Sequence, residues 1–263
     1  VYTHLEFCLQ VLWPELDVQI ASVTDQWAQF SIAGPNAREL VNGLVKENIT
    51  NETFPYMACS QATIGAVKGR LFRISFSGEE GYEIAVPARF GDALARELTK
   101  RAAALGGGWY GLEALNVLRI EKGLLTHAEL SGHTTPEDLG LGKMVSSKKD
   151  CIGKVLSQRA AMNAPGRQQL VALKPVSALE KFSAGAHLFK KGDAQTLAKN
   201  QGYITSHGYS PTLGHLIALA ILKDGRSRMG EHIVIKDHTR NIEAICEVVP
   251  TVHLDPEGEK LRG

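Results

Sequence analysis

Six short segments rich in Val, Ile and Leu follow one another in the last hundred residues, separated by Gly, Asp-Gly or other polar turns. Short apolar runs bounded in this way are typical of β-strands. Their number and spacing predict a small all-β barrel or sandwich over residues 164–263, with the boundary at "NAPG" (163–166). The segments are "RQQLVALKPV", "GAHLFKK", "QGYITSHGY", "HLIALAIL", "EHIVIKD" and "IEAICEVV".

The first hundred residues show a different pattern, in which strands alternate with helices. "DVQIASV" (17–23) and "WAQFSIAG" (27–34) indicate two strands, and a helix follows over 34–45. In 87–105 apolar residues recur every three or four positions, which predicts a helix with one buried face. This order indicates an antiparallel α+β lobe of the ferredoxin-like kind over residues 1–105.

The stretch "FRISFSGEEGYEIAVP" (72–87) predicts a β-hairpin. Apolar and polar residues alternate on both sides of the five residues 77–81, and the glycines of that connection take positive φ without steric cost. We expect Glu79 and Glu80, at the tip, to be solvated turn residues.

Three helices are expected in the segment 106–163, between the two patterns. The first covers 110–124. The second is a short helix within 132–142, where the letters "TPED" form a capping box. The third covers 151–161.

Composition argues against several kinds of partner. The 263 residues carry 29 Lys and Arg against 28 Asp and Glu, a net charge of +1, which does not favour nucleic acid or an anionic membrane surface. No apolar run reaches the length of about 18 residues that a membrane span needs. Four isolated cysteines indicate free thiols, so we expect a cytoplasmic protein. The chain begins inside a predicted helix that runs to Leu12, so we expect an N-terminally truncated piece of a longer protein.

Sequence signatures of metal, nucleotide and serine-hydrolase sites are absent. The sequence has no GxxxxGK[ST], no GxGxxG after a strand, no HExxH and no GxSxG. The nine histidines are scattered, and the six-residue separation of His127 and His133 is not a zinc spacing. We therefore expect no metal.

Glu121 lies on the inward stripe of its predicted helix, because the residues three, four and seven positions earlier are apolar. A buried carboxylate is costly unless it is paired or hydrogen-bonded. Two interpretations stay open. Glu121 either forms a structural ion pair with an arginine from elsewhere in the chain, such as Arg70 or Arg73, or it accepts a ligand with two parallel N–H donors, such as the edge of a pterin ring. Glu113 and Lys122, on other faces, are expected to be solvated.

Five motifs follow one another along the chain: "FRISFSGEEGYEI", "LRIEKG", "HTTPEDLGLG", "KDCIGK" and "DGRSRMGE". In order and spacing they resemble the folate-binding aminomethyltransferase family, whose best-known member is the T-protein of the glycine cleavage system. Within that family the chain is most similar to the C-terminal region of the α subunits of heterotetrameric sarcosine oxidases. The resemblance implies a multi-lobe α+β fold, with a ferredoxin-like lobe and a C-terminal β-barrel.

The resemblance also implies folate-binding residues. Glu121 matches the glutamate that holds the pterin edge, and Tyr82 and Glu83 belong to a hairpin beside the folate cavity. Tyr110 and Lys149 complete the expected set. The catalytic aspartate of the family lies upstream of the first residue, so no catalytic residue is expected in this chain.

The function that this resemblance implies is the folate-binding part of a sarcosine oxidase α subunit. There the one-carbon unit of oxidised sarcosine passes to tetrahydrofolate, giving 5,10-methylenetetrahydrofolate and glycine. Tetrahydrofolate would bind here, and FAD, FMN and NAD elsewhere in the full enzyme. The expected partners are the flavin-bearing β subunit and the small subunits, and the isolated chain should be inactive alone. The alternatives are a stand-alone folate-dependent aminomethyltransferase or demethylase, and a non-catalytic folate-binding accessory protein.

Overall fold

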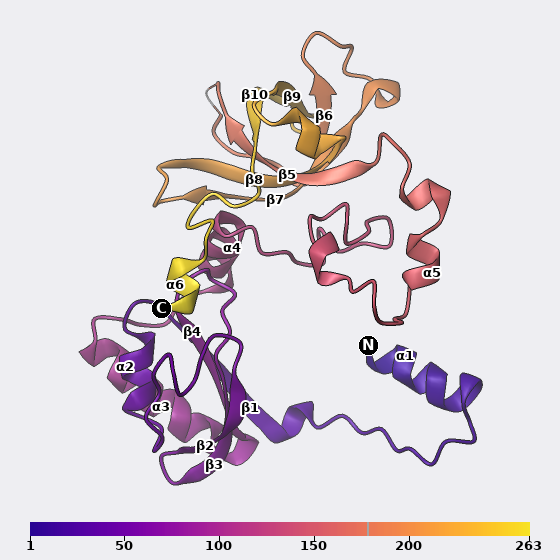
Figure 1. Ribbon diagram of the computed structural model, residues 1–263. Coiled ribbons are helices and arrows are strands. Elements are labelled where there is room, and N and C mark those ends of the chain that lie inside the picture. Colours follow the sequence, from indigo (N-terminus) through magenta and orange to yellow (C-terminus); the bar gives the residue numbers. More distant parts are fainter. Residues whose placement is uncertain (178) are drawn as a thin grey trace. The chain divides into compact units, whose positions relative to one another are not determined.

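The computed structural model describes residues 1–177 and 179–263, which form two compact units (Figure 1). The boundaries that the sequence indicates near residues 105 and 163 stay predictions. The first unit consists of residues 1–32, 36–74 and 82–108, and the second of residues 33–35, 75–81 and 109–263.

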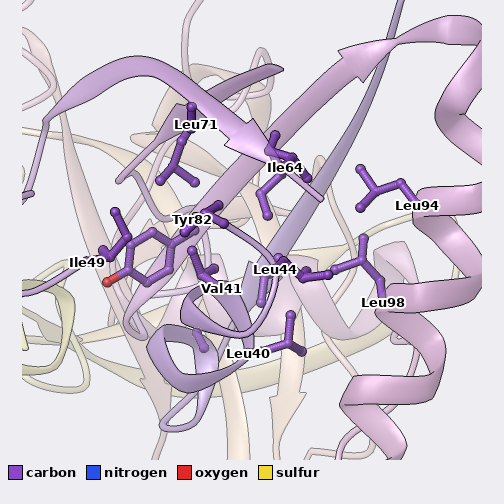
Figure 2. Packing of buried hydrophobic residues seen from close by; sticks show 14 of the residues in the cluster. Leu40, Val41, Leu44, Ile49, Ile64, Leu71, Tyr82, Leu94 and Leu98 are labelled. Atoms are coloured by element: carbon purple, nitrogen blue, oxygen red, sulfur yellow. The ribbon is translucent and has the colours of Figure 1, made fainter. Parts of the chain in front are cut away.

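The first unit is built on a four-stranded sheet of order β1-β4-β3-β2. Apolar side chains of the sheet and of two helices form its core, in which Val41, Leu71 and Tyr82 are fully buried (Figure 2). This arrangement confirms the expected α+β lobe. The strands are β1 (Trp27–Ala33), β2 (Cys59–Ile64), β3 (Val67–Phe72) and β4 (Gly81–Pro87), and the helices are α2 (Ala37–Asn42) and α3 (Gly91–Ala104).

Two predictions for the first unit were wrong. Residues 17–23 form no strand, because an alternating segment without a hydrogen-bonded neighbour is not stable as a strand. β2 was missed, and the strand expected from residue 72 onward lies earlier, as β3, although Gly65 closes the β2–β3 turn with a φ of +58°. The helix expected to run to Leu12 is confirmed as α1 (Tyr2–Phe7) and a π-helical turn (Cys8–Leu12).

The second strand of the hairpin predicted over 72–87 is confirmed as β4, but its first strand lies before residue 73 and the connection is longer than five residues. β3 ends at Phe72 and β4 begins at Gly81. The chain leaves the β3–β4 ladder at Arg73, whose backbone N–H donates to the Ala58 carbonyl at 2.9 Å. Residues 77–81 are thus only the second half of the connection.

The second unit contains a closed barrel in which six strands follow the order β10-β5-β8-β7-β6-β9, as the sequence predicts (Figure 1). β8 is apolar on both faces, because Ala218 and Ala220 belong to the barrel interior whereas Ile217 and Leu219 pack on its outside. The strands are β5 (Gln168–Pro175), β6 (His187–Lys190), β7 (Gly202–Ser210), β8 (His215–Lys223), β9 (His232–Asp237) and β10 (Ile242–Val249).

The helices predicted over 110–124 and 151–161 are shorter in the structure, as α4 (Leu112–Glu121) and α5 (Lys154–Ser157). A further short helix, α6 (Glu259–Arg262), was not predicted. The expected helix within 132–142 is wrong: the capping-box bonds form, with Asp138 N–H donating to Thr135 Oγ1 at 3.2 Å, but the chain continues as turns and Gly140 takes a φ of +76°. Among the described residues, no helix has the length and apolar character needed to cross a bilayer.

Candidate functional site at the end of α4

A buried ion pair holds α4 against β7. Arg119 Nη1 lies 3.3 Å from Glu129 Oε2, and the two side chains are 4 % and 0 % exposed. Ser206, on β7, bonds to both, since its hydroxyl donates to Glu129 Oε1 at 2.6 Å and accepts from Arg119 Nη2 at 2.6 Å. Gly208 of β7 also allows α4 to lie close to that strand, because a Cβ at this position would lie 2.9 Å from a methyl group of Val117 in α4. The helix is therefore fixed on the outer face of the barrel.

The electrostatics of this pair show that Glu129 is held as an anion. Burial raises the pKa of Glu129, but hydrogen bonds from Ser206, Thr126 and Thr205 and the charge of Arg119 outweigh burial, so the net pKa is lowered. Burial lowers the pKa of Arg119, and the charge of Glu129 opposes that change. The pair is a structural element, and sequence reasoning missed it.

Glu121 is the last residue of α4 and is only 4 % exposed, which confirms the burial expected from the sequence. Ser210, at the end of β7, donates its hydroxyl to Glu121 Oε1 at 2.5 Å. The hydroxyl oxygen also accepts the Leu213 N–H at 3.0 Å, which fixes its orientation. No other described side chain bonds to the carboxyl group, so its second oxygen keeps its accepting capacity.

The C-terminal segment completes the surroundings of Glu121. The backbone N–H groups of His253 and Leu254 donate to the Glu121 carbonyl at 2.8 Å and 3.0 Å. Next to it, Lys122 is buried and its Nζ lies 2.9 Å from Asp255 Oδ2. The expectation that Lys122 is solvated was wrong, because this aspartate from the far end of the chain compensates its burial. Glu113 is exposed as expected.

The arginines considered as structural partners of Glu121 have other contacts in the first unit. Arg70 stacks over the Trp27 ring, with Cζ 4.0 Å from the ring centroid. Arg73 is fully buried, and its Nη1 donates to Asn51 Oδ1 at 2.6 Å. Within the second unit, no described basic side chain forms an ion pair with Glu121.

The two site residues expected on the hairpin lie on opposite faces of β4 in the first unit. Tyr82 is fully buried in the core, and its hydroxyl accepts a hydrogen bond from Arg38 Nε at 3.3 Å. Glu83 is partly exposed and accepts a hydrogen bond from Gln29. Tyr82 thus supports the strand that presents Glu83, and a direct contact of either residue with folate stays a prediction.

The remaining residues singled out in the sequence belong to the second unit. Tyr110 is 41 % exposed immediately before α4, and Lys149 is exposed in the loop before α5. The structure shows no described contact that joins either side chain to Glu121, so their roles stay predictions. Glu79 is not simply solvated, because Lys260 Nζ lies 3.0 Å from its carboxylate, and Glu80 is only partly exposed. The described residues contain no cluster of side chains that could hold a metal ion.

Family models match both parts of the chain. The GCVT N-terminal domain matches residues 1–149, and the glycine cleavage T-protein C-terminal barrel domain matches residues 168–255. The chain belongs to the glycine cleavage T-protein family. The solved structure of the aminomethyltransferase T of the glycine cleavage system from Bartonella henselae has the same fold, with a TM-score of 0.70 and 23 % identity over 86 % of this chain and 60 % of that one.

Among T-protein family members, the chain is similar to two named groups of relatives. It is 47 % identical to the sarcosine oxidase subunit alpha of Rhizobium meliloti (strain 1021), over 99 % of this chain and 27 % of that protein, and 35 % identical to that of Corynebacterium sp. (strain P-1), over 100 % and 28 %. It is 30 % identical to the aminomethyltransferase of Oceanobacillus iheyensis, over 89 % of this chain and 62 % of that one. The chain spans about a quarter of the length of these α subunits.

Proposed function

We propose that Glu121 binds the pterin edge of a reduced folate. The observation that carries this proposal is the state of its carboxyl group, which is almost fully buried yet has Ser210 as its one described side-chain partner. A buried group of this kind gains free energy from a further donor. The pterin supplies N3–H and the 2-amino group side by side, which match the acceptors of one carboxylate.

We infer that the bound folate accepts a one-carbon unit that originates from sarcosine. Oxidation of sarcosine by a flavin elsewhere in the enzyme leaves a methylene iminium group on glycine. N5 and N10 of tetrahydrofolate form two bonds to the methylene carbon, the carbon–nitrogen bonds to glycine break, and glycine leaves as the amine. The identity to sarcosine oxidase α subunits over the whole chain supports this substrate.

The part of this chain in that reaction is positioning. Glu121 would fix the orientation of the pterin, and with it the place of the two nucleophilic nitrogens. Holding reactants in an attack geometry replaces a bimolecular encounter by an effectively unimolecular step. Exclusion of water also matters, because water would hydrolyse the iminium to formaldehyde. In this proposal the flavins and NAD act in the remaining length of the enzyme, and the chain works together with flavin-bearing subunits.

Titration calorimetry with 5-formyltetrahydrofolate, a folate that resists oxidation, tests the binding proposal. Glu121→Gln keeps the size of the side chain but places an amide donor against a pterin donor. Loss of a charge-assisted hydrogen bond costs about 1.5–3 kcal/mol, so we expect affinity to fall by about 10- to 150-fold. Glu113→Gln, an exposed change on the same helix, is the matched control. Equal affinity of both variants and the unmodified chain would overturn the proposal.

The 30 % identity to an aminomethyltransferase supports a second candidate, a transferase that works without a flavoprotein. Assays of 5,10-methylenetetrahydrofolate formation separate the two. If the chain is part of a sarcosine oxidase, product formation requires sarcosine and the flavin-bearing subunit. If it is a free transferase, product forms from a protein-bound aminomethyl donor without a flavin.

A further inference from the structure

A polar pocket of about 370 Å³ lies at one end of the barrel, where β6 and β8 end and β7 begins. Lys190, Gln201 and Lys223 come from these strand ends, and the turn between β8 and β9 supplies the rest of the lining. Gln201 precedes β7 and Ser210 ends it, so the pocket and the Glu121 site lie at opposite ends of this strand. The pocket therefore offers a site that the proposed folate chemistry does not use.

One lining residue of the pocket, Arg228, already uses its donors in bonds within the chain. Arg228 forms a bidentate pair with Glu231, with Nε–Oε2 and Nη2–Oε1 distances of 2.7 Å and 2.8 Å. Its Nη1 donates to Gln201 Oε1 at 2.6 Å and to the Lys223 carbonyl at 3.2 Å. These bonds neutralise Glu231 and give the pocket a fixed wall.

The turn that closes the pocket is built by Asp224. This residue takes a left-handed conformation with a φ of +50°, and its Oδ1 accepts the Gly166 N–H at 2.8 Å. Its carbonyl accepts the hydroxyl of Ser227 at 2.8 Å. The "DGRSRMGE" motif is thus explained in part as the frame of this pocket.

Two lysine ammonium groups at the pocket have no described partner in a hydrogen bond or ion pair. Lys190 and Lys223 are exposed side chains of its lining, and neither Nζ forms a hydrogen bond or ion pair within the described parts of the chain. The described lining carries three cations, Lys190, Lys223 and Arg228, against two acids, Asp224 and Glu231, so the pocket keeps a net positive charge. The charges of Arg228 and Lys190 both lower the pKa of Glu231. Lysine ammonium groups bind phosphate and carboxylate oxygens as point charges.

We propose that this pocket binds a small oxyanion with more than one negative charge, between Lys190 and Lys223. The ligand class is a phosphoryl group or a dicarboxylate of a small metabolite. The volume falls within the range of small-ligand pockets, and the polar lining favours a charged ligand over an apolar one.

Amide chemical-shift titration of the ¹⁵N-labelled chain tests the proposal, with inorganic phosphate in one arm and malonate in the other. Sodium chloride keeps the ionic strength constant, because a change in salt concentration would by itself alter the interactions of exposed charges. We expect saturable shifts at Gly225 and Ser227 at millimolar anion. Lys190→Gln and Lys223→Gln should each weaken binding about tenfold, and Lys191→Gln, an exposed neighbour outside the pocket, should not.

Saturation in one arm identifies the source, phosphoryl or carboxylate. Linear shifts without saturation in both arms, or equal affinity of Lys191→Gln and Lys223→Gln, would overturn the proposal. Glu121→Gln should leave anion binding unchanged, because it lies at the other end of β7. A failure of the folate proposal is therefore distinguishable from a failure of this one.

Discussion

Glu129 and Glu121 are two buried carboxyl groups of the second unit with opposite surroundings, and their replacement by glutamine should have opposite results. Glu129 faces the Arg119 guanidinium at 3.3 Å, whereas Glu121 meets the Ser210 hydroxyl and no described cation in this unit. We predict that Glu129→Gln strongly destabilises the second unit and that Glu121→Gln does not.

The magnitude follows from the geometry of the pair. Two unit charges 3.3 Å apart attract each other by about 5 kcal/mol at an effective dielectric constant of about 20. The amide of Glu129→Gln still accepts hydrogen bonds, but it leaves a buried guanidinium without its counter-charge. Removal of one partner from a buried pair costs about 3–5 kcal/mol. Glu121→Gln removes a buried carboxylate that has no counter-ion among the described side chains of the second unit, so stability should change by less than about 1 kcal/mol or rise.

Urea unfolding at pH 7, followed by circular dichroism and by hydrogen exchange of β7 and β8 amides, measures both effects. The midpoint of Glu129→Gln should fall with an unchanged slope. The double variant Arg119→Met with Glu129→Met should recover part of the loss, because it strands no charge, and it keeps the test valid if the single variant does not fold. Equal losses for Glu129→Gln and Glu121→Gln would refute this reasoning.

Three further predictions follow from other groups of the second unit and from the cysteines. Burial, helped by the charges of His215 and Lys174, lowers the pKa of His253 from 6.5 to about 4. As the pH drops from 6.5 to 4, the unfolded chain therefore binds a proton that the folded chain does not, and the free energy of unfolding should fall. In His253→Gln, the urea midpoint should depend less on pH across that window. Burial raises the pKa of Cys246 to about 12, so in the native protein at pH 8 iodoacetamide should modify the exposed Cys59 and Cys151 but not Cys246, as peptide mass spectrometry can show. Lys122→Met removes the counter-charge of Asp255, whose carboxylate keeps the backbone N–H groups of Glu259 and Lys260 as donors, so the urea midpoint should fall and amides of the C-terminal segment should exchange faster.

The parts of the fold that sequence reasoning predicted are those in which local pattern and packing agree. The barrel strands alternate or run apolar between clear turns, and α3 presents Leu94 and Leu98 at helical spacing to the core (Figure 2). Residues 17–23 alternate equally well but have no strand beside them. Periodicity reports one face of a strand and carries no information about its hydrogen-bonding neighbour.

In the candidate site, too, the features set by local spacing could be predicted and those set by long-range packing could not. Burial of Glu121 could be predicted, because it depends on the spacing of residues within one helix. Ser210 could not, because its place depends on the register of β7 and on how α4 crosses the barrel. Lys122 was expected to be solvated for the same reason, since its partner Asp255 is distant in sequence. Long-range pairing of polar groups leaves no periodic signal in a single sequence.

The bonds around Glu121 also set an order of events during synthesis. Its hydroxyl partner comes 89 residues later, and the amides that bond to its carbonyl come later still, at positions 253 and 254. A chain that emerges from the ribosome with its N-terminus first can form α4 early, because helical contacts are local. The carboxyl group stays hydrated until the barrel has closed and residues 253 and 254 have emerged. A nascent chain arrested at residue 240 would therefore carry the helix without the complete surroundings of Glu121.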